Sequence, residues 1–95
     1  MVAIISIEDE SKYLDYQEGV LALFEETGVD VLAVDDAPVA IESETRSQRM
    51  VVLRFADEDD FNAWYQSDAY ALIKPIRLGA STGEVHLLQA SNLKF

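Results

Sequence analysis

The chain of 95 residues carries 18 acidic and 7 basic side chains, for a formal net charge of −11, and 49% of its residues are apolar. This length suits a single domain over residues 1–95 and leaves no room for a second core. The apolar content excludes a disordered chain. The excess of acid excludes nucleic acid and anionic membrane surfaces as expected partners, because Lys and Arg bind both.

Cysteine is absent and histidine occurs once, at His86, so we expect no disulfide, no thiolate nucleophile and no metal site. Residues 1–10 (MVAIISIEDE) lack the basic start and the long apolar run that signal peptides and membrane spans need. We therefore expect a cytoplasmic protein.

The N-terminal part predicts a strand followed by a helix. Residues 2–7 (VAIISI) form a β-branched run that is typical of a strand covered on both faces. Residues 12–27 predict a helix, with Asp9 or Ser11 as its N-cap and Gly28 as its C-terminal cap. The apolar face of this helix comprises Tyr13, Tyr16, Val20, Leu21 and Phe24, with Leu14 and Leu23 beside them.

Two further strands follow in the chain. Residues 29–34 predict the second strand, which Pro38 interrupts because proline lacks the donor that a sheet needs. Residues 39–41 are a candidate for a short edge piece beyond that turn. Residues 49–55 (RMVVLRF) predict the third strand.

The C-terminal part predicts helices and a last strand. Asp57 is the expected N-cap of one helix. Ser67 or Asp68 is the expected cap of a further short helix that ends at Lys74, because Pro75 disfavours a helical residue before it. A loop is expected over residues 79–83 and the last strand over 85–90. The buried stripe of the helix after Asp57 comprises Phe61, Trp64 and Tyr65.

These elements occur in the order β-α-β-β-α-β, which is the order of ferredoxin-like α+β folds. Such a fold has a four-stranded antiparallel sheet with the helices on one face. Its first and third strands lie at the centre of the sheet, and in this chain they are the most continuously apolar strands.

The helices cover one sheet face, yet the predicted strands offer apolar side chains to both. An uncovered sheet would expose more apolar area than a monomer usually tolerates. We therefore expect a homodimer that packs through the helix-free sheet face as a dimeric α/β barrel, with Arg54 a candidate to pair with an acid across the interface. The alternative is a monomer whose outer face is partly polar through Ser6, Asp30, Arg54 and Gln89.

A recognisable pattern occurs in the strings RMVVLRF, AWYQSDAY, KPIR and ASTG, and its most specific part is W-Y-x-S-x-x-Y-x-x-x-K-x-x-R, from Trp64 to Arg77. The chain thereby resembles the DUF1330 family of uncharacterised bacterial proteins over most of its length. The resemblance implies a dimeric α/β barrel, in a superfamily that includes cofactor-free monooxygenases, haem-degrading enzymes, muconolactone isomerases and stress-response proteins. The pair Asp35-Asp36 departs from the small residues or glycine expected there, and it disfavours an anionic site near that turn.

Tyr70, Lys74 and Arg77 occur at helical spacing, so one helix face would carry a phenol, an ammonium and a guanidinium. Such a set can bind a carboxylate or an enolate, with Arg77 holding it bidentately. Arg49 joins this candidate ligand site on the resemblance alone, and Trp64 is a candidate for its apolar wall. In the structural alternative the aromatic residues pack in the core and the cations pair with surface acids.

Two functions remain open from the sequence. The first is a cofactor-independent site between helices and sheet that binds or converts a small anionic or carbonyl-bearing molecule, with no residue identified as catalytic. The second is a non-catalytic dimeric binding or stress-related module in which the same residues serve structure. An apolar pocket lined by Tyr70 or Arg77 would favour the first function, and a filled interface would favour the second. His86 is expected as a core or interface residue.

Overall fold

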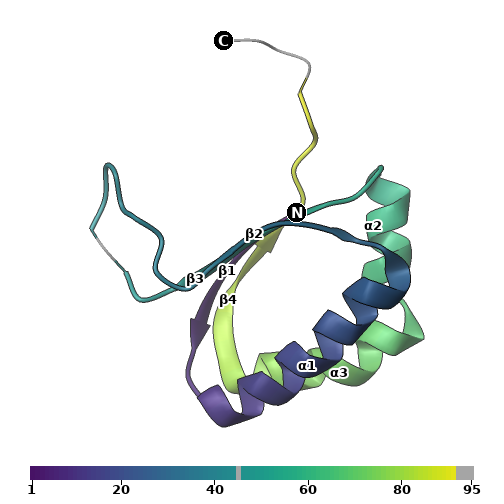
Figure 1. Ribbon diagram of the computed structural model, residues 1–95, viewed down its shortest axis with the longest axis horizontal. Coiled ribbons are helices and arrows are strands. Elements are labelled where there is room, and N and C mark those ends of the chain that lie inside the picture. The colour runs from purple at the N-terminus through teal and green to yellow at the C-terminus, as the bar shows by residue number, and fades with distance from the viewer. Residues whose placement is uncertain (45, 92–95) are drawn as a thin grey trace.

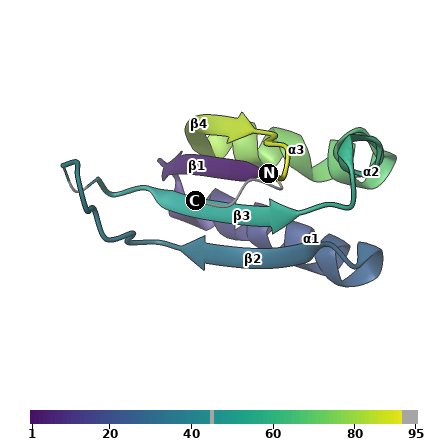
Figure 2. The same cartoon turned by 90° about the horizontal axis from the view of Figure 1, so that it is seen from above.

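The computed structural model describes residues 1–44 and 46–91. The elements are β1 (Val2–Ile7), α1 (Glu10–Thr27), β2 (Asp30–Asp35), β3 (Arg49–Arg54), α2 (Glu58–Tyr65), α3 (Asp68–Ala80) and β4 (Ser81–His86). The strands form one antiparallel sheet in the order β2-β3-β1-β4 (Figure 2), and the helices lie on one face of it (Figure 1). This confirms the ferredoxin-like arrangement, with β1 and β3 at the centre.

The sequence at both ends of α1 determines where the helix begins and ends. The Oδ1 atom of Asp9 accepts a hydrogen bond from the backbone N–H of Lys12 at 3.2 Å, which makes Asp9 the N-cap. Gly28 follows the helix with φ of 71°, a left-handed conformation that glycine adopts at little cost. Both predicted caps are confirmed. The buried residues of α1 are Tyr13, Tyr16, Val20 and Leu23, while Leu21 is half exposed.

Helix α3 is longer than predicted. Ser67 is its N-cap, as expected, but the helix does not end at Lys74 and runs through Pro75 instead. A proline inside a helix removes one backbone hydrogen bond and costs about 3 kcal/mol. Beyond the proline, Arg77 and Ala80 are 8% and 0% exposed, so packing of this last part against the core outweighs that cost.

Strand β4 begins earlier than predicted, because Ser81–His86 replaces the expected loop over 79–83 and the expected strand over 85–90. Every residue of β4 pairs with β1, so the central strand decides where its neighbour lies. Gly83 allows this pairing, since a Cβ atom there would come within 2.2 Å of the carbonyl oxygen of Ile4.

The segment between β2 and β3 projects away from the helices (Figure 1). No strand forms over residues 39–41, where Val39 and Ile41 are 82% and 85% exposed, so the predicted edge piece is wrong. The Oδ1 atom of Asp35 accepts a hydrogen bond from the backbone N–H of Ala37 at 2.9 Å. Such an Asx turn directs the chain off the sheet edge.

The helix-free face of the sheet is apolar at its centre and polar at its margins, as the pairing register and the alternation of side chains show. The central side chains are Val2, Ile4, Met50 and Val52, and the polar ones are Ser6, Asp30, Arg54, Thr82, Glu84 and His86. Arg54 forms an ion pair with Asp30 of the same chain at 2.8 Å. The side chain of His86 is 58% exposed beside Glu84, so His86 does not lie in the core, and the expected interface position stays a prediction.

Candidate functional site

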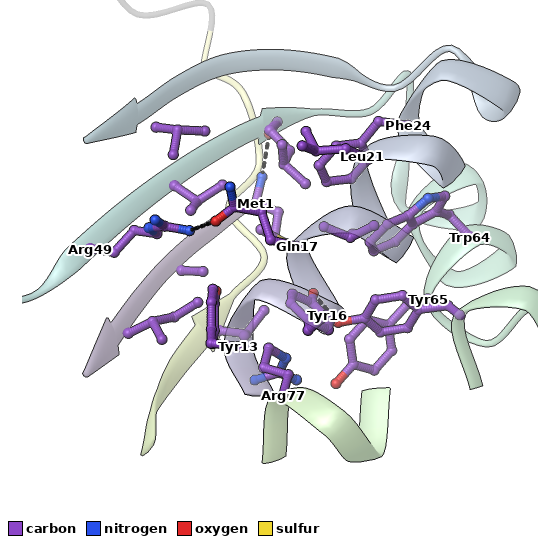
Figure 3. Close-up of a pocket in the computed structure, with 18 of the residues that line it drawn as sticks. Met1, Tyr13, Tyr16, Gln17, Leu21, Phe24, Arg49, Trp64, Tyr65 and Arg77 are labelled. Carbon is purple, nitrogen blue, oxygen red and sulfur yellow. Dashed lines mark hydrogen bonds between the residues drawn. The ribbon is translucent and has the colours of Figure 1, made fainter. Parts of the chain in front are cut away.

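A pocket of about 320 Å³ lies between the inner face of the sheet and the helices. Its volume is at the lower end of the range for small-molecule sites. Figure 3 shows Arg49 and Trp64 at opposite ends of the pocket, with Tyr13, Tyr16 and Arg77 along one wall. The pocket therefore combines an aromatic interior with a few polar groups that come from different elements.

Four of the five predicted site residues line this pocket: Tyr70, Arg77, Arg49 and Trp64. Lys74 is not among the lining residues, and its Nζ atom lies 4.5 Å from the centroid of the ring of Tyr65, which does line the pocket, in a cation–π contact. The place of Lys74 in the site stays a prediction.

Arg77 is a charged side chain buried in the pocket wall. It is 8% exposed, and its Nε donor has no hydrogen-bond partner. In the described part of the chain no carboxylate forms an ion pair with it, although the protein has 18 acidic residues. A buried cation costs several kcal/mol unless an anion compensates it. The site thus contains a guanidinium whose charge the folded chain leaves unpaired.

Two phenols lie near that guanidinium. The hydroxyls of Tyr16 and Tyr70 are 2.9 Å apart and buried. Whichever hydroxyl accepts this bond keeps its own proton for a further acceptor. Burial raises the pKa of Tyr16, and the neighbouring Tyr70 raises it further, so the Tyr16 phenol stays protonated and able to donate.

Tyr13 also lines the pocket, and burial raises its pKa although Arg49 and Arg77 act in the opposite direction. Neither Tyr13 nor Tyr16 was predicted as a site residue, because both fit the apolar face of a helix. The sequence contained one indication of a role in the site. Each tyrosine brings a hydroxyl into the interior, where a buried tyrosine usually needs a hydrogen-bond partner.

Trp64 contributes a second buried hydrogen-bond donor that has no partner. Its ring packs against Phe24, Phe55 and Tyr70, with centroid separations of 5.7, 5.6 and 4.5 Å. Its Nε1 donor is buried without a hydrogen-bond partner, whereas a buried indole N–H normally has one. Trp64 is therefore both a core residue and a pocket wall that can donate one hydrogen bond.

Arg49 lines the other end of the pocket, but its Nε and one terminal nitrogen already have acceptors in the protein. Its Nε atom lies 2.5 Å from Oδ1 of Asp36, and one terminal nitrogen donates to Oε1 of Gln17 at 2.6 Å. The guanidinium also lies 5.2 Å from the ring centroid of Tyr13. Burial alone would lower the pKa of Arg49, and the hydrogen bond and charge of Asp36 raise it.

Within residues 1–44 and 46–91, no group of three or more His, Cys, Asp or Glu side chains is arranged to hold a metal ion. The same part of the chain contains no helix both long and apolar enough to cross a bilayer.

A sequence search of curated proteins finds no match to this chain. Residues 1–91 match the family described as "Domain of unknown function (DUF1330)", and the chain belongs to this family.

Proposed function

We propose that the protein binds a small, largely apolar molecule whose single anionic group, a carboxylate or an enolate-like oxygen, is held by Arg77. The observation that carries this proposal is the buried guanidinium without an acidic partner among the described residues. A bound carboxylate would neutralise Arg77 and accept from its unpaired Nε. Hydrogen bonds to charged groups each contribute about 1.5–3 kcal/mol.

The rest of the pocket supports a ligand with an apolar body. Its lining includes the side chains of Val20, Phe24, Leu53 and Trp64, which suit an aromatic ring or a short alkyl chain. The spare proton of the Tyr16–Tyr70 pair and the indole N–H can each donate to a carbonyl or hydroxyl oxygen. A module whose residues serve structure alone would have a filled interface here, so the pocket and its unpaired donors favour the ligand site. No step of this proposal needs a cofactor.

Trp64 allows a direct test, because it is the one tryptophan in the chain and it lines the pocket. Its fluorescence would be followed during titration with phenylacetate, benzoate and hexanoate, with neutral phenylacetamide as the matched control. We expect saturable changes with carboxylates, weaker binding of the amide, and at least about 10-fold weaker carboxylate binding in Arg77→Met. If no carboxylate distinguishes the variant from the wild type, the proposal fails.

We also propose that a second copy of the chain covers the helix-free sheet face, in the cytoplasm, where salt screens the net charge of −11. The apolar centre and polar margin of that face match the anatomy of protein interfaces. Sedimentation at micromolar concentration should give a particle of about twice 10.6 kDa. Val52→Asp should shift it toward a monomer, whereas Leu72→Asp on the exposed side of α3 should not. A wild-type particle of 10.6 kDa would contradict the dimer.

A further inference from the structure

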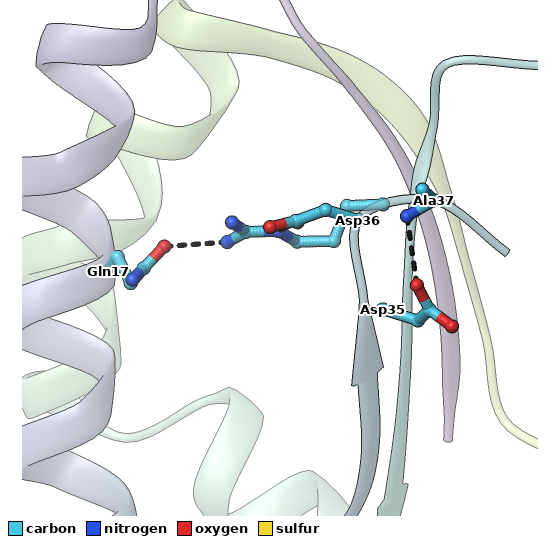
Figure 4. A network of polar contacts seen from close by, with 5 residues as sticks. Gln17, Asp35, Asp36 and Ala37 are labelled. Carbon is cyan, nitrogen blue, oxygen red and sulfur yellow. Dashed lines mark hydrogen bonds and ion pairs between the residues drawn. The ribbon is translucent and has the colours of Figure 1, made fainter.

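The Arg49 end of the pocket contains a carboxylate that belongs to the chain itself. Asp36, the residue after β2, places its Oδ1 atom 2.5 Å from Nε of Arg49, while Gln17 of α1 binds the same guanidinium from the other side. Figure 4 shows Gln17 and Asp36 reaching toward each other between α1 and the end of β2. Both residues line the pocket.

The two guanidiniums of the pocket therefore differ in one respect. Arg77 has no carboxylate partner among the described residues, whereas Arg49 already has Asp36. A ligand that enters the pocket encounters one guanidinium without a carboxylate partner and one that Asp36 neutralises.

We propose that Asp36 determines ligand specificity, by occupying Arg49 so that the pocket accepts ligands with one carboxylate and disfavours those with two. This inference rests on the proposed function, because it assumes that the first carboxylate binds Arg77. The second carboxylate of a dicarboxylate would have to displace Asp36, which is tethered beside Arg49 and competes as an intramolecular ligand. Asp36 would also repel that second anion at short range.

The surroundings of Asp36 indicate that its removal would leave a usable second site. The side chain of Asp36 is 71% exposed, so the core does not depend on it, whereas the side chain of Arg49 is 15% exposed. Gln17 and the ring of Tyr13 continue to hold the Arg49 guanidinium once the carboxylate has gone. The freed Nε would then point to the position that Asp36 had occupied.

The test compares Asp36→Asn with Asp35→Asn. Both substitutions are nearly isosteric and remove one negative charge, but Asp35 accepts a hydrogen bond from the backbone of Ala37 and does not touch Arg49. Phenylacetate and a series of carboxyphenylacetates, in which the second carboxylate is at the ortho, meta or para position, would be titrated against each protein by Trp64 fluorescence.

We expect the wild type to prefer phenylacetate to every dicarboxylate. Asp36→Asn should raise the affinity for at least one dicarboxylate, relative to phenylacetate, by about 10- to 100-fold. Asp35→Asn should leave that ratio unchanged, and adding Arg49→Met to Asp36→Asn should abolish the gain. If phenylacetate binds through Arg77 and the ratio does not move in Asp36→Asn, the role of Asp36 is overturned and the proposed function survives. If no carboxylate binds through Arg77, both are overturned.

Discussion

Replacing Arg77 with methionine removes a charge from the pocket wall and keeps an unbranched apolar chain in its place. The structure predicts that the variant folds at least as stably as the wild type while it loses carboxylate binding. This follows because the guanidinium is 8% exposed, has no ion pair among the described residues and leaves its Nε donor unpaired. If Arg77 were retained because it stabilises the fold, Arg77→Met would lower the free energy of unfolding instead.

The magnitude follows from the same contacts. An unpaired buried donor costs about 1–3 kcal/mol, so its removal should raise the free energy of unfolding by up to that amount, less any packing lost with the longer side chain. Removing one partner from a buried structural ion pair instead lowers stability by about 3–5 kcal/mol. For a domain of this size each kcal/mol changes Tm by about 4–8 °C, so the two cases are easily separated.

The assay is denaturant unfolding of the wild type and Arg77→Met at one protein concentration, because self-association also shifts apparent stability. Arg54→Met is the matched control, since Arg54 forms an exposed ion pair with Asp30 and such pairs contribute about 0–1 kcal/mol. A loss of more than about 2 kcal/mol in Arg77→Met would refute the reasoning, because it would mean that another group of the protein stabilises the Arg77 guanidinium.

Two other predictions concern stability. Burial and the neighbouring Tyr70 raise the folded-state pKa of Tyr16 above its usual value of 10.0, so its neutral form stabilises the fold below pH 10.0 and that contribution is lost as pH rises further. Tyr16→Phe should therefore lose less stability than the wild type when unfolding is compared between neutral pH and about pH 11; an equal loss in both would contradict this. Gly83→Ala should lower stability by about 1–3 kcal/mol, because its Cβ would meet the Ile4 backbone. Gly79→Ala, in α3 with no atom within 4 Å of the added Cβ, should be neutral or stabilising by up to about 1 kcal/mol, as thermal unfolding would show; similar losses in both variants would contradict the clash.

The predictions that the structure confirms depend on local chemistry. Asp9 and Gly28 limit α1 through contacts within a few residues, and Ser67 begins α3 in the same way. The order of the central strands follows from their apolar composition, since the strands with most apolar side chains need two neighbours.

The predictions that failed depend on contacts between distant parts of the chain. Pro75 predicts a helix end locally, but burial of Arg77 and Ala80 against the core extends α3 beyond it. Residues of β4 are assigned to a strand because β1 lies beside them, and no periodicity within GASTG indicates this pairing.

Only part of the candidate site could be predicted, because the sequence shows local spacing but not contacts between distant residues. Helical spacing groups Tyr70 with Arg77, and the resemblance adds Arg49, but neither reveals which cation has a partner. That distinction depends on Asp36, which is 13 residues from Arg49 in the chain. The acidic pair Asp35-Asp36 lies at this turn, and Asp36 neutralises the Arg49 guanidinium.

The central claim is that a carboxylate binds the unpaired donor of Arg77 in the pocket that Trp64 also lines. Proton–nitrogen NMR tests it most directly, because the single tryptophan gives one indole signal and each arginine side chain gives an Nε–H signal. During titration with phenylacetate, the Trp64 indole and the Arg77 Nε–H should shift together and saturate at one ligand concentration, while the Nε–H of Arg54 stays unchanged. The account is contradicted if neither signal saturates with any of the monocarboxylates, or if the Nε–H signals of Arg54 and Arg77 shift equally.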